Sequence, residues 1–441
     1  MKDDSKTLLK DVLAWVFAGL VIAFGLALIS KAEAHSTGYI HANNKSFHGP
    51  TGQPFRMKGF NLPEQLMTEG WLIGAPYAKM NGVAHEPSNR TYLNNIEAGY
   101  ADFYFNNLKN NYLTATEINL LVDTIGANVF RVPVAAWMFT DYDAYARLDS
   151  IITWANAKNA YVMIDLHTTV PCQNDATFCD PNLPDNAAPF WDSTAGQNGV
   201  IALWKEIATR YKNQPAVLGY NLVNEPNNYP HSITEKTEIW QFYIAAINEI
   251  RTVDTNHLII LDGDNWAGEL DLFKKRTNPP FNPETVDSNW AMGFHDYSAS
   301  GCNLSLILQY GEAQYLANKK AQLTTRLQSV FADVADVNVP VIVGEYGAEC
   351  DLAQQAYHEV FDEQGIQHTF YFAPFGVDQG TVFSMILARY PAPYWDGYTD
   401  VLGNGNKPSG TLATQAFTEM LNKTGLAIDV DRLSDFQGFF Q

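Results

Sequence analysis

Short apolar runs alternate with longer helical segments along the chain from about residue 50 onward. In each run, β-branched and aliphatic residues follow one another directly, which is typical of parallel strands buried on both faces. The predicted strands are 55–61, 128–132, 161–166, 217–222, 258–262, 291–295, 339–344 and 369–372. Apolar residues at helical spacing predict helices between them, among them 116–124, 148–158, 203–212, 235–251 and 313–332.

This alternation predicts an α/β fold, namely a (β/α)8 TIM barrel with long loops after strands one and three. The two loops cover residues 62–113 and 168–199. A doubly wound open sheet is the alternative architecture, because it is built from the same repeating unit. We expect a single domain over residues 35–441, preceded by a separate segment 1–34.

Polar residues stand where the predicted strands end. A barrel gathers the carboxyl ends of its strands at one opening, where enzymes with this fold have their active sites. Each such residue alone could be structural, but their recurrence at one end of successive strands predicts a common site. The residues are Asn61, Glu64, Arg131, Asp165, His167, Asn224, Glu225, Asp264, Asn265, Trp266, His295, Tyr297 and Glu345.

Two of these residues are acids that follow apolar strands directly. Glu225 stands in Asn-Leu-Val-Asn-Glu-Pro, and Glu345 stands in Val-Ile-Val-Gly-Glu-Tyr. A glutamate in this position can also be the first-turn acid that stabilises the following helix. Facing each other across one pocket, however, two carboxyl groups can cleave a glycosidic bond.

At these positions the chain resembles glycoside hydrolase family 5, the cellulase-type family of retaining β-glycosidases. The resemblance covers roughly residues 50–380, and segments 204–211 and 344–351 are most similar to the branch with exo-acting β-1,3-glucanases. The matching stretches are Asn-Val-Phe-Arg131-Val-Pro-Val, Ile-Asp-Leu-His167, Asn224-Glu225-Pro226, His295-Asp-Tyr297 and Gly344-Glu345-Tyr346.

The resemblance implies a role for each matching residue. Glu225 would be the general acid/base and Glu345 the nucleophile, with neither cofactor nor metal. Arg131 near Glu345 would keep the nucleophile ionised, and Tyr297 could donate to the same carboxylate. The other expected substrate-binding residues are Asn224 at the sugar 2-hydroxyl, His167 and His295 at hydroxyls and beside the acids, and Trp266.

The chain departs from the family after the eighth strand. The family usually presents a tryptophan there, as the floor of the subsite that holds the cleaved sugar. Residues 368–376 contain no tryptophan. Tyr371, Phe372 or Phe375 is the expected replacement, and a smaller ring changes the area on which a sugar can stack.

The charge of the chain limits its partners. A formal net charge of −20 argues against nucleic acid, because phosphate backbones are bound by clustered lysines and arginines. An acidic surface with abundant aromatic rings suits a neutral polysaccharide or oligosaccharide, since sugar faces stack on rings and hydroxyls bond to carboxylates. An ordinary acidic surface explains the same charge equally well.

The N-terminal segment predicts a location outside the cytoplasm. Residues 12–29 are apolar and follow three lysines, and Ala32-Glu33-Ala34 fits a cleavage site. Residues 1–34 are therefore either a signal peptide or a membrane anchor, because about 18 apolar residues can just span a bilayer. A secreted, periplasmic or cell-surface protein is expected in both cases.

Four cysteines agree with an oxidising compartment. They allow three connectivities, of which Cys172 with Cys179 and Cys302 with Cys350 is the expected one.

The leading hypothesis is a retaining glycoside hydrolase that cleaves a β-linked glucan or a related β-glycan with two glutamates. A catalytically silent, surface-anchored barrel that binds carbohydrate is the alternative. A metal-dependent hydrolase has less support, because the chain contains neither a His-x-His nor a His-Glu-x-x-His sequence.

Overall fold

A computed structural model describes residues 38–63, 66–67, 94, 98–99, 101–103, 106, 113–141, 143–175, 179, 184–277, 280–371, 373–377, 384–388 and 426–428. The predicted signal or anchor segment 1–34, the residue Glu64 and most of the first long loop lie outside these residues. Among the helices that it does describe, none combines the length and apolar character needed to cross a membrane.

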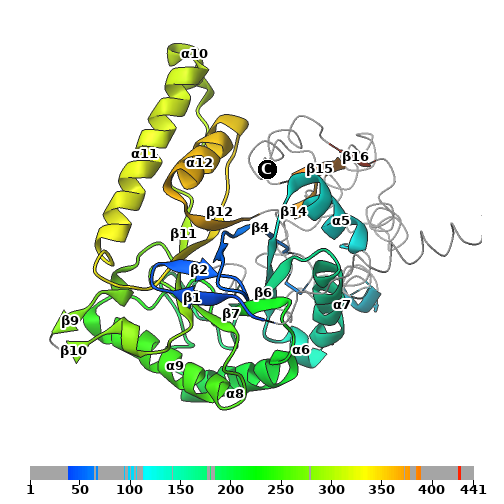
Figure 1. Ribbon diagram of the computed structural model, residues 1–441, viewed down its shortest axis with the longest axis vertical. Coiled ribbons are helices and arrows are strands. Elements are labelled where there is room, and N and C mark those ends of the chain that lie inside the picture. Colours follow the sequence, from blue (N-terminus) through cyan, green and yellow to red (C-terminus); the bar gives the residue numbers. More distant parts are fainter. Residues whose placement is uncertain are drawn as a thin grey trace, which may run out of the picture.

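Within the described residues, eight parallel strands close into a barrel in sequence order (Figure 1). They are β4 (Lys58–Asn61), β5 (Val129–Ala135), β6 (Tyr161–Thr168), β7 (Val217–Asn221), β8 (Leu258–Asp262), β11 (Trp290–Asp296), β12 (Val341–Tyr346) and β13 (Gln367–Phe370). The last strand, β13, pairs in parallel with the first, β4. This closure confirms the (β/α)8 barrel and excludes the open sheet.

The first predicted strand, 55–61, is divided in the structure. Phe55 belongs to β3 (Pro54–Phe55), which pairs with β2 (Ser46–His48) in an antiparallel sheet that also holds β1 (His41–Asn43). The barrel strand starts only at Lys58. Ile40, just before β1, and Phe47 of β2 pack with residues at the amino ends of the barrel strands, so the sheet covers that opening (Figure 1).

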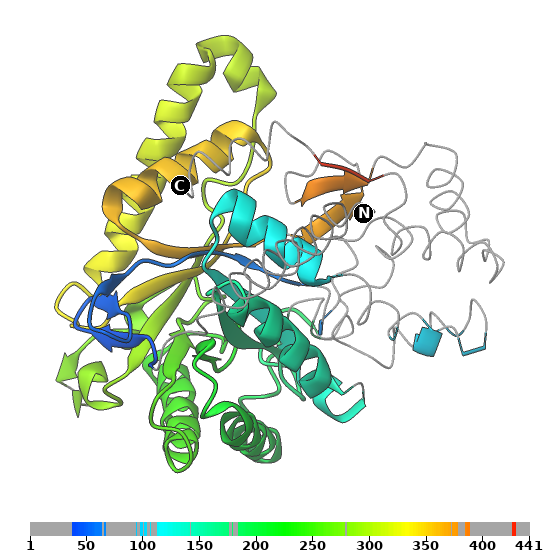
Figure 2. The same cartoon turned by 45° about the vertical axis from the view of Figure 1, so that its right-hand side comes forward.

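Helices surround the barrel, with α7, α8 and α9 on one side and α11 and α12 on the other (Figure 2). The long helices are α7 (Ala144–Asn156), α8 (Thr194–Tyr211), α9 (Ile233–Arg251), α11 (Glu312–Ala332) and α12 (Asp351–Gln364). The short ones are α5 (Ala115–Asn119), the π-helix η1 (Leu120–Ile125), α6 (Met138–Asp141), α10 (Leu304–Tyr310) and the 3-10 helices η2 (Asp271–Phe273) and η3 (Pro283–Thr285). Further strands are β9 (Arg276–Thr277), β10 (Pro280–Phe281), β14 (Ala373–Val377), β15 (Ser384–Ala388) and β16 (Leu426–Ile428).

The second long loop is shorter than predicted, because its last residues, 194–199, form the start of α8. Ser193 caps that helix, and its hydroxyl accepts a hydrogen bond from the Gly196 amide at 3.1 Å. Both expected disulfides are present, Cys172 with Cys179 inside this loop and Cys302 with Cys350 after β11 and β12. The prediction of the cysteine pairing is therefore confirmed.

Candidate active site

Glu225 and Glu345 come together at the carboxyl end of the barrel. Glu345 lies within β12, and Glu225 follows β7. One carboxylate oxygen of each, together with a ring nitrogen of His295, lies within 4.8 Å of the others. The Glu225 side chain is 13% exposed and that of Glu345 only 5%.

Arg131 is fully buried beneath the two acids. From β5, its Nη1 donates to Glu345 Oε1 at 2.6 Å and to Asn61 Oδ1 at 2.9 Å, while Nη2 donates to Asn224 Oδ1 at 2.7 Å. The guanidinium Nε donates to Asn221 Oδ1 at 3.0 Å. Only the planar fork of an arginine can hold partners from several strands in this way.

His167 stands beside Arg131 as a neutral ring. Burial lowers the pKa of His167 to about 3, so the ring carries a single hydrogen at neutral pH. Its Nδ1 lies 2.7 Å from Asp165 Oδ2, and its Nε2 lies 3.2 Å from the Asn224 amide nitrogen. The neutral ring therefore donates to Asp165 and accepts from Asn224. Arg131 Nη2 also contacts Asp165 at 3.1 Å.

Glu345 is held from two sides. Tyr297 donates its hydroxyl to Glu345 Oε2 at 3.0 Å, and Arg131 bonds to the other oxygen. Burial raises the pKa of Glu345 above its ordinary value, although His295 and Arg131 both lower it. Arg131 thus acts in the expected direction, but burial outweighs it because the carboxylate loses more hydration than the guanidinium replaces.

The surroundings of Glu225 favour its protonated form. His295 Nδ1 lies 2.9 Å from Glu225 Oε1, and the Glu225 amide donates to Asp262 Oδ2 at 3.2 Å. Burial raises the pKa of Glu225 to about 8, and the nearby negative charge of Asp262 adds to the effect. The backbone φ of Glu225 is +46°, a left-handed conformation that is uncommon outside glycine.

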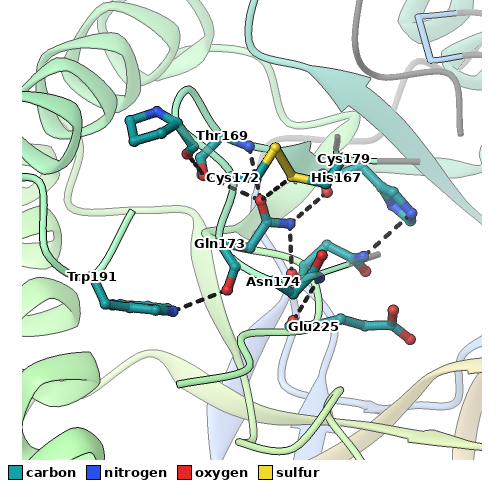
Figure 3. Close-up of a disulfide and its surroundings, with 10 residues drawn as sticks. His167, Thr169, Cys172, Gln173, Asn174, Cys179, Trp191 and Glu225 are labelled. Atoms are coloured by element: carbon teal, nitrogen blue, oxygen red, sulfur yellow. Dashed lines mark hydrogen bonds between the residues drawn. A yellow bond between two sulfur atoms is a disulfide. The ribbon is translucent and has the colours of Figure 1, made fainter. Parts of the chain in front are cut away.

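The loop of the first disulfide holds the backbone around Glu225 (Figure 3). Gln173 Nε2 donates to the carbonyl oxygens of His167 at 2.8 Å and Asn224 at 3.0 Å, and Asn174 donates to the carbonyl of Glu225 at 2.9 Å. Gln173 and Asn174 were not predicted from the sequence. Their position next to Cys172 is the available signal, because a disulfide fixes the loop that carries them.

Trp266 lies next to this loop. Its half-buried ring packs against the disulfide of Cys172 and Cys179, and its amide donates to the carbonyl of Pro226 at 3.3 Å. Trp266 and its two neighbours, Asn265 and Ala267, all have positive φ angles between 54° and 60°. Such backbone conformations cost free energy and persist only where the surroundings impose them, which is frequent at functional sites.

Two more polar residues that contact the site residues were not expected from the sequence. Asn221 and Asp262 are the last residues of β7 and β8, and their side chains bond to each other at 3.0 Å. Asp264, which was expected at the site, instead lies 3.1 Å from His231 Nδ1.

The expected aromatic platform is described only in part. Tyr371 is 2% exposed and its ring lies 6.2 Å from that of His167. Phe372 lies outside the described residues, and of Phe375 only the backbone, in β14, is described.

Among the described residues, Glu225, His295 and Glu345 form the group whose donor atoms are close enough to hold a metal ion. The Arg131 guanidinium, 2.6 Å from Glu345, already supplies positive charge there. A second cation beside it would be repelled, so the donor set fits a carboxyl pair better than a metal centre.

Comparison with known proteins finds one matching family and several relatives. Residues 88–373 match the family described as Cellulase (glycosyl hydrolase family 5). A β-xylosidase of Phanerodontia chrysosporium is 27% identical over 209 residues, which are 46% of this chain and 41% of that protein. A probable glucan 1,3-β-glucosidase A of Aspergillus niger is 24% identical over 224 residues, 48% of this chain and 52% of that protein. The chain thus spans about half the length of these relatives.

The fold also occurs among solved structures. The β-glucanase SdGluc5_26A from Saccharophagus degradans superimposes with a TM-score of 0.50 over 88% of this chain and 96% of that one. The two sequences are 17% identical, so this similarity concerns the fold.

Proposed function

The chain belongs to glycosyl hydrolase family 5, and from this premise we propose that it is a retaining glycosidase that hydrolyses a β-linked glucan or a related β-glycan. The observation that carries the proposal is the distance between oxygens of Glu225 and Glu345, which is within 4.8 Å. Retaining glycosidases need carboxyl groups about 5–5.5 Å apart, whereas inverting ones need roughly 6.5–9.5 Å to fit a water molecule between them.

In the first step, the Glu345 carboxylate attacks the anomeric carbon and the bond from that carbon to the leaving oxygen breaks. Glu225 gives its proton to the leaving oxygen, so the first sugar product departs as an alcohol and a glycosyl ester remains on Glu345. The pKa of Glu225, raised to about 8, supports this role because the acid is still protonated at neutral pH.

In the second step, water attacks the anomeric carbon and the ester bond to Glu345 breaks. Glu225, now a carboxylate, takes a proton from that water, so both acids return to their starting states. Arg131 and Tyr297 contact the two oxygens of Glu345, and these contacts support its role as the leaving carboxylate.

The substrate-binding roles are part of the same proposal. Asn224 uses one amide hydrogen for His167 and has a second, which we assign to the sugar 2-hydroxyl. His167 and His295 orient the acids, and the half-buried ring of Trp266 is assigned to a sugar face.

Export from the cytoplasm is proposed as well. Two disulfides support an oxidising compartment, since such bonds rarely persist in the cytosol. Residues 1–34 would direct the chain there, either as a cleaved signal peptide or as an anchor through residues 12–29.

Trapping the ester tests the proposal directly. The folded protein is incubated with an activated 2-fluoro β-glucoside or β-cellobioside, and the peptides are analysed by mass spectrometry. We expect a glycosyl adduct on the peptide that contains Glu345 and no adduct in a Glu345→Gln variant. An adduct on another carboxylate would overturn the assignment.

The same experiment separates the enzyme from a barrel that only binds carbohydrate. A folded protein that binds β-glucan oligosaccharides in calorimetry, yet neither forms an adduct nor releases product, would favour the binding role. Glu225→Ala is the informative second variant. It should still form the adduct from an activated glycoside, whose leaving group needs no proton, and should lose activity on unactivated ones.

A further inference from the structure

We propose that Asp262 is a positioning residue that acts through His295 to keep the transferable proton on Glu225. This inference rests on the proposed function of Glu225 as general acid. Asp262 touches neither substrate nor reacting atoms in the proposed mechanism, and it acts through its neighbours.

Asp262 is placed for this role by three contacts. It is the last residue of β8 and is completely buried. Its Oδ2 accepts the Glu225 amide hydrogen at 3.2 Å and lies 3.6 Å from His295 Nε2, while its Oδ1 accepts from Asn221 at 3.0 Å. The carboxylate is therefore fixed beside both the backbone of the acid and the imidazole that contacts it.

The barrel leaves room for this carboxylate at one position of the neighbouring strand. Gly293 of β11 lies opposite Asp262 in register. A Cβ atom at Gly293 would come within 2.1 Å of Asp262 Oδ1. Any larger residue there would displace the carboxylate, so β8 and β11 are matched in sequence for a buried aspartate.

His295 connects Asp262 to the proton of Glu225. Its Nδ1 lies 2.9 Å from Glu225 Oε1, and its Nε2 makes no hydrogen bond within the described residues but faces Asp262. When the ring carries one hydrogen, a carboxylate on that side favours the tautomer with the hydrogen on Nε2. Nδ1 then offers a lone pair, which accepts from the protonated Glu225 carboxyl and so stabilises its acid form.

The other charges around Glu225 leave this role to Asp262. Asp262 and Asp165 raise the pKa of Glu225 in addition to burial, and Arg131 lowers it. Asp165 contacts His167 at 2.7 Å and Arg131 at 3.1 Å, whereas Asp262 lies farther from Arg131, at 3.9 Å, and contacts the Glu225 amide itself. In the described part of the chain, the charged and titratable groups around Glu225 are Arg131, Asp165, Asp262, His295 and Glu345, and Tyr297 contacts Glu345 next to them.

The variant Asp262→Asn tests the proposal, because it removes the charge and keeps the shape. Its kcat/KM is measured against pH with a phenyl β-glycoside, whose departure needs protonation, and with a dinitrophenyl β-glycoside, whose departure does not. For the phenyl substrate we expect the basic limb to move to lower pH by about one unit or more, the usual effect of removing a neighbouring charge. The dinitrophenyl rate should change by only a few fold. A folded Asp262→Asn protein with an unmoved basic limb would overturn the inference.

Asp254→Asn is the matched control, because Asp254 also pairs with a histidine at the other end of β8. Asp254 Oδ2 lies 2.5 Å from His257 Nδ1 and the residue is 1% exposed. This variant should lose stability and keep the basic limb of the wild-type pH profile.

If Asp262→Asn does not fold, Gly293→Ala displaces the same carboxylate and should move the basic limb in the same direction. An unmoved limb in folded Gly293→Ala would also count against the inference.

Failure of this inference and failure of the proposed function give different results. If Glu225→Ala loses phenyl and dinitrophenyl activity equally, Glu225 is not the acid and the proposed function fails. If Glu225→Ala discriminates between the leaving groups but Asp262→Asn has a normal pH profile, only the inference about Asp262 fails.

Discussion

At the scale of single residues, the two acids predict a bell-shaped pH dependence. In the proposed mechanism, activity requires Glu225 protonated and Glu345 ionised. Burial raises the pKa of Glu225 to about 8, so kcat/KM should fall as the pH rises past that value. The pKa of Glu345 is also raised, so the acidic limb should lie above 4.5, its ordinary value. A pH series of kcat/KM measures both limbs. A rate that stays constant across the whole range would contradict the assignment of one protonated and one ionised glutamate.

The substitution Arg131→Lys tests the role of the hydrogen bonds that the buried guanidinium makes. A lysine keeps the charge but cannot bond at once to Asn61, Asn224 and Glu345. We expect kcat/KM to fall by about a hundredfold or more, and the free energy of unfolding to fall by about 3 kcal/mol, as happens when a buried pair is broken. Urea denaturation measures the second quantity.

The control for that substitution is Arg147→Lys in α7. Arg147 is also buried, and it donates to the carbonyl of Leu113 away from the acids. It should lose stability without losing comparable activity. Equal activity losses in the two variants would mean that Arg131 acts only by supporting the fold.

Which site residues could be foreseen depends on where they stand relative to a strand end. Residues such as Glu225 and His295 are polar groups at or beyond the tip of an apolar run, and this pattern is visible in a sequence. Asp262 and Asn221 are the last residues of their strands and lie inside the barrel. A single polar residue within an apolar run does not by itself indicate a site residue. Gln173 bonds to backbone carbonyls, which every residue has, so its position next to Cys172 is the signal that the sequence offers.

At the scale of elements, the two disulfides should contribute differently. The first closes a loop with a sequence separation of 7 and the second one with a separation of 48. In the chain-entropy model, their removal costs about 2.5 and about 4 kcal/mol of unfolding free energy, because the longer loop restricts the unfolded chain more. Thermal and urea unfolding of the two double Cys→Ser variants measure this difference.

Activity should rank the two variants in the opposite order. The first loop carries Gln173 and Asn174, whose side chains hold the backbone of His167, Asn224 and Glu225. Cys172→Ser with Cys179→Ser should therefore lower kcat/KM more than the other pair does, despite its smaller effect on stability. The reverse ranking in activity would mean that this loop does not position the acid.

Element prediction succeeded where burial dictates sequence. All eight apolar runs became barrel strands, because strands covered on both faces tolerate few polar residues. The first run was too long because Phe55 is equally suited to the small antiparallel sheet. Its partner Phe47 in β2 is far less distinctive in sequence than a barrel strand.

At the scale of the whole molecule, closure of the barrel follows from strand number and tilt, which no single residue encodes. The pairing of β13 with β4 joins residues some 300 positions apart, such as His368 and Lys58. The sequence predicted eight units in order, and both the closed barrel and the open sheet were compatible with them. The geometry of closure is what gathers the acids, since it brings β7 and β12 to face each other across one opening.

The net charge of −20 gives the last prediction, which concerns stability. With 48 acidic and 28 basic residues, like charges repel one another across the folded surface, and salt screens that repulsion. We expect Tm to rise by a few degrees between about 10 and 300 mM sodium chloride, where the Debye length falls from roughly 30 to below 8 Å. KM for a neutral oligosaccharide should stay nearly constant over the same range. A falling Tm would mean that surface ion pairs, such as Lys320 with Glu359 and Glu363 between α11 and α12, outweigh the repulsion, because salt weakens those pairs too.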